Sequence, residues 1–201
     1  MLNFKELQDK ADKSLVNSKS SPKTTCVLYI LVIILTIFID YRFFKMSLIS
    51  NIIMAVFIIF LTIGFNWFCL KVSRDEHPSM KLLLEPFKHP IKVISLLVII
   101  LLLTAASSLL LIIPGIIIAI RCSQAFNIFF DDPKVGILDA IKESYKLMSG
   151  RVVEYIKLNL SLLPWVIMVF ASGGFIAFYV IPYYKITTSY YYNTLCEPSL
   201  C

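Results

Sequence analysis

Six long apolar stretches separated by short polar connections constrain this chain more than any other feature of its sequence. They cover residues 25–44, 48–70, 93–113, 115–130, 152–171 and 175–194. A helix rises about 1.5 Å per residue, so roughly 20 apolar residues cross the roughly 30 Å hydrocarbon core of a bilayer. The pattern predicts an all-α fold, a polytopic transmembrane helical bundle with six spans, between polar tails at residues 1–24 and 196–201.

The composition excludes most other classes of protein. Hydrophobic residues make up 58% of the 201 residues, and the mean hydropathy is +0.81, far above the balance of a soluble domain. The net charge of +6 does not indicate nucleic acid, because the basic residues lie mainly in short loops, where they orient spans and contact anionic headgroups. We therefore expect membrane lipids as partners, and no nucleic acid.

The distribution of basic residues between the stretches predicts the orientation. If the chain crosses the membrane six times, 16 of its 19 Lys and Arg residues lie on one side. Arg42 and Lys45 lie on the other side, and Arg121 lies inside a span. Because cytoplasmic loops carry an excess of basic residues, we expect both termini and the loops at 71–92 and 131–152 to be cytoplasmic.

The third and fourth stretches are nearly continuous, so their separation needs an argument. One helix over residues 93–130 would be about 57 Å long at 1.5 Å per residue, too long for a single crossing. Pro114 and Gly115 offer a break, because proline lacks an N–H donor and disfavours helix in the residue before it. We predict a hairpin that turns at these two residues, which also keeps the basic loop at 131–152 cytoplasmic.

Two shorter segments have the apolar spacing of amphipathic helices. Residues 3–15 have such a spacing and predict a short interfacial helix. A second helix is predicted after Asp131-Asp132-Pro133, with one apolar stripe formed by Ile137, Leu138, Ile141, Tyr145 and Met148. We expect this helix on the cytoplasmic surface. Whether its stripe faces the membrane or packs on the protein's own bundle stays open.

The sequence contains no familiar catalytic or metal-binding motif. It has no HExxH zinc helix, GxSxG elbow, Walker loop or dinucleotide fingerprint. His77 and His89 lie in one proline-interrupted loop, without the restrained spacing that metal ligands need. We therefore expect a non-enzymatic protein with no catalytic residues, no metal and no cofactor.

Arg121 is the strongest candidate for a binding residue. It lies six residues after Gly115 and ten before Asp131, inside the fourth stretch. An intramembrane charge is costly and normally faces a partner or water. Gln124 and Asn127 extend its helix face, and Ser108 lies across the predicted hairpin. These four residues predict an intramembrane polar pocket for a headgroup, an anion or a peptide; a structural clamp or a snorkelling arginine is the open alternative.

Two functions from different classes fit these features. The first is a non-enzymatic membrane module that binds a membrane protein partner, a lipid or a membrane-active peptide, or that associates with further copies of itself. The second is a small transporter or channel in which Arg121 lines a polar pocket.

Several short motifs follow one another over residues 110–195. They are Ile113-Pro114-Gly115-Ile116, Asp131-Asp132-Pro133, Ala140-Ile141-Lys142-Glu143-Ser144, Met148-Ser149-Gly150, Pro182-Tyr183, Tyr191-Tyr192 and Leu195. Their order and spacing resemble the bacterial integral-membrane family called domain of unknown function 975. The resemblance implies a six-helix protein of the bacterial cell membrane, most typical of Gram-positive bacteria, with no established activity. A more distant likeness, to membrane domains attached to glycerophosphodiester phosphodiesterases, implies no catalysis, because this chain lacks their catalytic domain.

Overall fold

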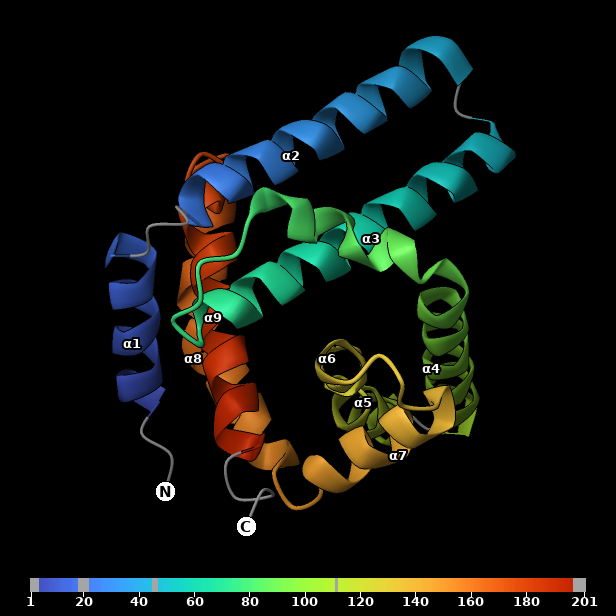
Figure 1. Cartoon of the computed structure of the whole chain (residues 1–201), viewed down its shortest axis with the longest axis vertical. Coiled ribbons are helices and arrows are strands. Elements are labelled where there is room, and N and C mark those ends of the chain that lie inside the picture. Colours follow the sequence, from blue (N-terminus) through green and yellow to red (C-terminus); the bar gives the residue numbers. More distant parts are fainter. Residues whose placement is uncertain (1–3, 18–21, 45–46, 111, 197–201) are drawn as a thin grey trace. The chain divides into compact units, whose positions relative to one another are not determined.

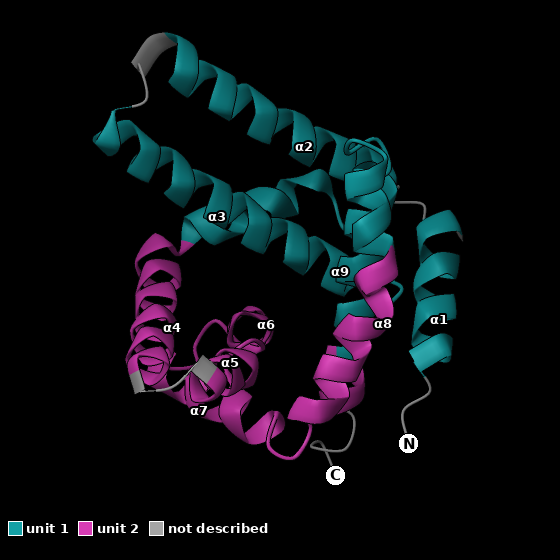
Figure 2. Cartoon of the chain, turned by 180° about the vertical axis from the view of Figure 1, so that it is seen from behind, with its two compact units in different colours: residues 1–88, 165–191 teal, residues 89–164, 192–201 magenta. Residues whose placement is uncertain are grey.

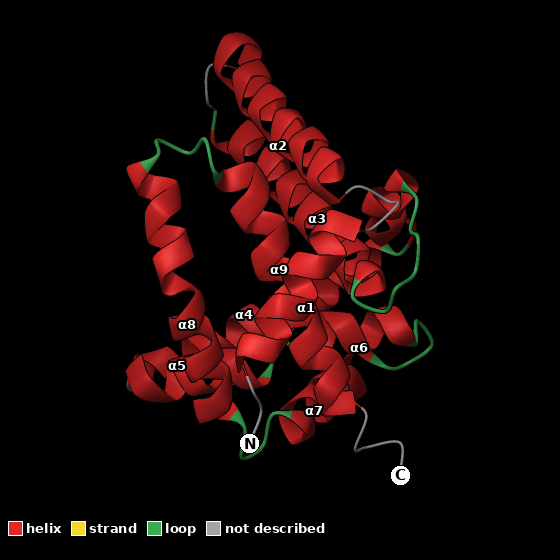
Figure 3. Cartoon of the chain, turned by 90° about the vertical axis from the view of Figure 1, so that its left-hand side faces the viewer, coloured by secondary structure: helices red, strands yellow, loops and turns green. Residues whose placement is uncertain are grey.

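The computed structural model describes residues 4–17, 22–44, 47–110 and 112–196 (Figure 1). These residues form helices joined by loops and include no strand (Figure 3). The elements are α1 (Phe4–Asn17), α2 (Pro22–Ile39), the π-helix η1 (Asp40–Phe44), α3 (Leu48–Val72), the 3-10 helix η2 (Met80–Lys88), α4 (Pro90–Leu110), α5 (Ile112–Arg121), α6 (Ala125–Asp131), α7 (Ile137–Leu147), α8 (Val152–Ala171) and α9 (Ala177–Cys196). The predicted C-terminal tail after Cys196 lies outside the described residues.

The chain divides into two compact units (Figure 2). The first unit comprises residues 1–88 and 165–191, and the second comprises residues 89–164 and 192–201. The division passes through α8 and α9, so each of these helices contributes to both units.

Five helical segments of the described chain are long and apolar enough to cross a membrane. They are Pro22–Arg42, Leu48–Val72, Pro90–Leu109, Ile113–Asp131 and Val152–Ala171. Large apolar side chains on them are exposed, including Ile34, Ile52 and Leu102, each more than half exposed, as expected where lipid replaces water as the solvent. The chain is therefore an all-α protein with the helices of a multi-pass membrane protein.

The last predicted span coincides with α9, which is helical but does not meet the same criterion of length and hydropathy. Its sequence carries many hydroxyl groups, from six tyrosines, three threonines and a serine, and they lower its mean hydropathy. The sequence predicted six spans, and five are found among the described residues.

In the first unit, α2 and α3 pack side by side as a hairpin. The ring of Tyr29 stacks on Phe65 at 4.9 Å between centroids, and its hydroxyl hydrogen-bonds to Thr62 at 2.9 Å. η2 then packs along α3, where the Phe87 ring lies 5.6 Å from Phe57 and 4.9 Å from Phe60. Aromatic pairs at these distances stabilise packing beyond the area they bury.

The amphipathic helix predicted near the N-terminus is present as α1, but its apolar face packs on the protein. Leu7, Ala11 and Leu15 are spaced four residues apart and are all buried. The Ser14 hydroxyl lies 2.7 Å from the Tyr190 hydroxyl, and the Tyr179 hydroxyl donates to the Asp12 carboxylate. The interfacial interpretation is therefore wrong for this face, because α9 and its neighbours in the first unit cover it.

In the second unit, α4 and α5 form the predicted helical hairpin. The prediction of a turn at Pro114 and Gly115 is wrong, since α5 begins at Ile112 and both residues lie inside it. Pro114 is the third residue of α5, where a missing N–H costs no helical hydrogen bond. Gly115 lets the helices approach closely, because a Cβ atom there would lie 3.0 Å from the Cα of Ser108. Pro114 is thus suited to the first turn of α5, and Gly115 allows α5 to pack closely on α4; neither residue forms the predicted turn.

The predicted amphipathic helix after Pro133 is present as α7, which contacts α4, α5 and α6. Ala140, Ile141, Ser144 and Met148 are buried, which confirms packing on the protein's own bundle. The predicted stripe is wrong for Leu138 and Tyr145, which are 59% and 45% exposed. The buried face is therefore rotated toward the small residues that let α7 approach its neighbours.

Candidate functional site: a polar helix break around Arg121

The predicted fourth span is not one continuous helix. α5 ends at Arg121, residues 122–124 form a turn, and α6 begins at Ala125. Such a break leaves carbonyl groups at the end of one helix and N–H groups at the start of the next without helical partners. The site is built around the side chains that satisfy these groups.

Ser144 of α7 joins the two helix ends. Its hydroxyl donates to the Arg121 carbonyl at 2.7 Å and accepts from the Gln124 N–H at 3.2 Å. Ser144 is completely buried, so losing its hydroxyl would leave two buried backbone groups unpaired. This one side chain therefore holds the break in place and fixes the position of Arg121.

A chain of amide and hydroxyl groups continues from the break. The Asn127 amide donates to the Gln124 side-chain oxygen at 3.0 Å, and the Gln124 amide donates to the Ser123 hydroxyl at 3.0 Å. Gln124 and Asn127 are 3% and 6% exposed. Ser123 and Asn159 both hydrogen-bond to the Tyr155 side chain of α8. The network thus brings α8 to the site as a fourth helix, beside α5, α6 and α7.

The guanidinium group of Arg121 does not take part in this hydrogen-bond network. Its carbon lies 4.4 Å from the centroid of the Tyr145 ring, a distance typical of cation–π contact. Its Nε is buried and has no hydrogen-bond partner among the described residues, and no described carboxylate forms an ion pair with it. A guanidinium has five N–H donors and no acceptor, so the site retains unused donors and an unneutralised positive charge.

Three of the four predicted site residues come together, and the fourth does not. Arg121, Gln124 and Asn127 lie on or beside the helix break. Ser108 is exposed, donates to the Thr104 carbonyl at 2.8 Å and packs against Gly115, near the start of α5 rather than its end. The prediction was correct that Ser108 faces α5 across the hairpin, but Ser108 lies beside Gly115 and not beside Arg121.

Sequence reasoning missed Ser144 and Tyr145. Ser144 lies on the buried face of α7, four residues after Ala140 and four residues before Met148. A hydroxyl on such a face needs a partner, and that is the signal that could have found it. Tyr145 was assigned to the apolar stripe, although its half-exposed ring is the surface on which Arg121 lies.

The described residues hold no group of three or more His, Cys, Asp or Glu side chains arranged to bind a metal ion. Cys26, Cys69, Cys122 and Cys196 are free thiols. The donors at the helix break are amides, hydroxyls and a guanidinium, which suit an anion or a polar headgroup better than a metal cation.

Comparison with known proteins gives a family. The model of the family described as protein of unknown function DUF975 matches residues 95–199, more than half of the chain. This range contains the whole of α5, α6 and α7 and therefore the helix break around Arg121. Neither a curated protein nor a solved structure matches the chain. The chain belongs to the DUF975 family, whose function is unknown.

Proposed function

We propose that this protein is a non-enzymatic, multi-pass membrane protein that binds an anionic group at Arg121, as a lipid headgroup or as the acidic group of a membrane-associated partner. The observation that carries the proposal is the unpaired, half-buried guanidinium beside Tyr145. A buried charge without a counter-ion is costly, and an incoming anion would remove that cost.

The surroundings of Arg121 favour binding over a purely structural role. A structural arginine usually pairs with a carboxylate or donates to several carbonyls, and its planar group is then saturated. Ser144, Gln124 and Asn127 instead satisfy one another and the backbone. The local fold therefore does not need the charge of Arg121, which leaves it available for a ligand.

Replacing Arg121 with methionine separates the two roles. Met keeps a long apolar stem but removes the donors, so Arg121→Met should leave the melting temperature in detergent unchanged or raised. Anionic lipid or partner that copurifies from native membranes, quantified by mass spectrometry, should fall at least tenfold. Arg121→Lys should restore binding only in part, because an ammonium cannot reproduce the planar fork.

Lys142→Met is the matched control, because Lys142 lies on α7 with its side chain 77% exposed and, among the described residues, forms an ion pair with Asp139 alone. It should change neither stability nor the copurified molecules. A folded Arg121→Met protein that retains the same bound lipids and partners as the natural chain would overturn the proposal and leave Arg121 as a structural residue.

We further propose that the chain crosses a bacterial cell membrane six times, with both termini cytoplasmic. The bias of basic residues supports this orientation, as does the contact between Ser14 of α1 and Tyr190 of α9. Helices near opposite ends of the chain meet there, which is compatible with an even number of crossings. With five apolar spans, α9 would supply the sixth.

Labelling of single cysteines in a cysteine-free variant tests this topology. Ser47→Cys and Phe175→Cys should react with an impermeant maleimide on intact cells, whereas Ser79→Cys and Ser149→Cys should react only after permeabilisation. Tyr179 of α9 contacts Asp12 and Lys23, so an α9 that lies wholly beside α1 is the competing arrangement. In that case Phe175→Cys would be protected in intact cells, and the sixth crossing would be excluded.

A further inference from the structure

A polar cavity in the first unit forms a second candidate site, independent of Arg121. It has a volume of about 420 Å³ and opens to solvent between α1, the segment after α3, and α9. α1 contributes Lys10 and Lys13, the segment after α3 contributes Asp75 and His77, and α9 contributes Tyr190. Cavities of about 300–1,000 Å³ are typical of small-molecule sites.

The cavity wall after α3 is formed by a hydrogen-bonded helix C-terminus. The Asp75 N–H donates to the Val72 carbonyl at 3.1 Å, and the Glu76 N–H donates to the Lys71 carbonyl at 3.0 Å. This pair of bonds is the Schellman ending of a helix, in which the residue at the place of Asp75 is usually glycine. Asp75 has a φ of +57°, the left-handed conformation that non-glycine residues seldom adopt. A carboxylate is thus kept on the cavity wall at a cost in backbone energy.

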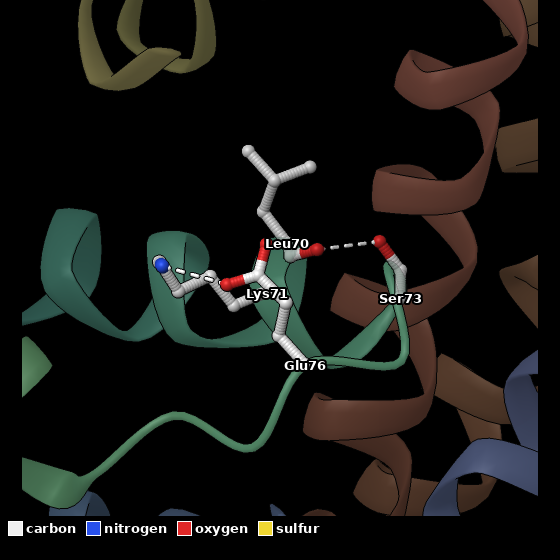
Figure 4. A network of polar contacts seen from close by, with 4 residues as sticks. All are labelled: Leu70, Lys71, Ser73 and Glu76. Carbon is white, nitrogen blue, oxygen red and sulfur yellow. Dashed lines mark hydrogen bonds and ion pairs between the residues drawn. The ribbon is translucent and has the colours of Figure 1, made fainter.

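Ion pairs neutralise some of the charges around the cavity and leave others. Glu76 pairs with Lys71 at 2.7 Å, beside the bond from Ser73 to the Leu70 carbonyl (Figure 4). Lys10 pairs with Glu6 at 2.9 Å. Among the described residues, Lys13 and Asp75 form no ion pair. One ammonium on the α1 wall and one carboxylate on the wall after α3 therefore remain for a ligand.

This arrangement does not suit a simple ion. An anion at Lys13 would meet the carboxylates of Asp75 and Glu76, and a cation at Asp75 would meet the ammonium groups of α1. A ligand that carries both charges satisfies both walls. Ser14 and Tyr190 share one hydrogen bond, so one of their two hydroxyls keeps a proton that it can donate to the oxygens of the anionic group, and the imidazole of His77 adds another donor.

We propose that this cavity binds a phosphoethanolamine group, with its phosphate at Lys13 and its ammonium at Asp75. The cavity is lined by Val72, the last residue of the α3 span, and therefore lies where lipid headgroups are found. The same chemistry occurs in a membrane phosphatidylethanolamine and in a soluble phosphoethanolamine ester, and the experiment distinguishes these two sources.

The first arm uses soluble probes on the full chain in detergent. Glycerophosphoethanolamine should raise the melting temperature and bind by calorimetry at least tenfold more tightly than glycerol 3-phosphate, which lacks the ammonium. Glycerophosphocholine should also bind more weakly, because its quaternary ammonium has no N–H to donate to Asp75. The second arm reconstitutes the protein in nanodiscs that contain phosphatidylethanolamine and counts retained lipid by native mass spectrometry.

Asp75→Gly is the decisive variant. Glycine adopts a positive φ freely, so the ligand-free variant should melt at the same or a higher temperature. If Asp75 holds the ligand, the same variant should lose at least tenfold in binding, a combination that a purely structural residue does not produce. Lys13→Met should weaken binding similarly, and Asp139→Asn on α7, an exposed residue of the second unit, should leave it unchanged.

The two arms give distinct outcomes. Retention only in the nanodisc arm assigns the site to the lipid, and binding in the soluble arm assigns it to a free ester. Equal affinity for glycerol 3-phosphate would show a simple anion site and overturn the proposal. Unchanged binding by Asp75→Gly, or no binding in either arm, would overturn it as well, without bearing on the Arg121 variants.

Discussion

Replacing Gly64 with alanine is expected to separate η2 from α3. A Cβ atom at this position would lie 2.7 Å from the carbonyl carbon of Leu83 and 2.8 Å from its Cα. Both atoms are backbone, so no side-chain rotation relieves the overlap. We expect a loss of roughly 3 kcal/mol in the free energy of unfolding, the upper end of the usual cost of adding a methylene to a packed interface.

The measurement is thermal unfolding of the purified protein in detergent, together with its abundance in membranes. Gly136→Ala is the matched control, because a Cβ there meets only the end of the Asp139 side chain, which can move aside. It should cost less than about 1 kcal/mol. Equal melting temperatures for the two variants would contradict the close packing of η2 on α3.

Hydropathy alone could predict most of the fold. Five spans needed only length and apolar content, since a bilayer admits few alternatives to a helix. The same signal could not place α9, whose tyrosines and threonines serve burial in the first unit rather than contact with lipid. Tyr183, Thr187 and Tyr191 are all buried. A run of hydroxyl-bearing residues does not reveal whether they face lipid, water or another helix.

Close packing was beyond the reach of the sequence for a different reason. Gly64 lies in an unbroken apolar run, where nothing marks it as the point at which η2 touches α3. The Pro114-Gly115 pair was recognised as special, but its two effects act inside α5 and not at a turn. A proline or a glycine in the sequence can mark a turn, the start of a helix or a close contact between helices. Only the tertiary structure shows which of these roles the residue has.

The candidate site was predicted in part because a charge inside an apolar stretch is conspicuous. Arg121 was found for this reason, and Gln124 and Asn127 followed from helical spacing. Ser144 lies 23 residues away on another helix, and its role depends on a helix break that the hydropathy pattern does not show. The approach of the Lys13 wall to the Asp75 wall likewise depends on the packing of α1 against α9, and the amphipathic pattern could not assign α1 to a partner.

Replacing Ile141 with aspartate is expected to have the largest effect of any single change in the second unit. Ile141 is 7% exposed on α7, which contacts α4, α5 and α6. An unpaired carboxylate buried among apolar helices costs about 3–5 kcal/mol. The variant should unfold at a markedly lower temperature in detergent and accumulate poorly in membranes.

Two substitutions calibrate this result. Ile141→Val removes one methylene and should cost about 1 kcal/mol, so a graded response would identify packing as the cause. Glu143→Gln changes an exposed residue of the same helix and should have almost no effect. Because Ser144 lies on the buried face with Ile141, displacement of α7 should also release Arg121, and the anion binding that we propose there should be lost along with stability. Normal stability of Ile141→Asp would mean that this face of α7 is in contact with water. In that case α7 could not be the element that holds the break between α5 and α6 in place.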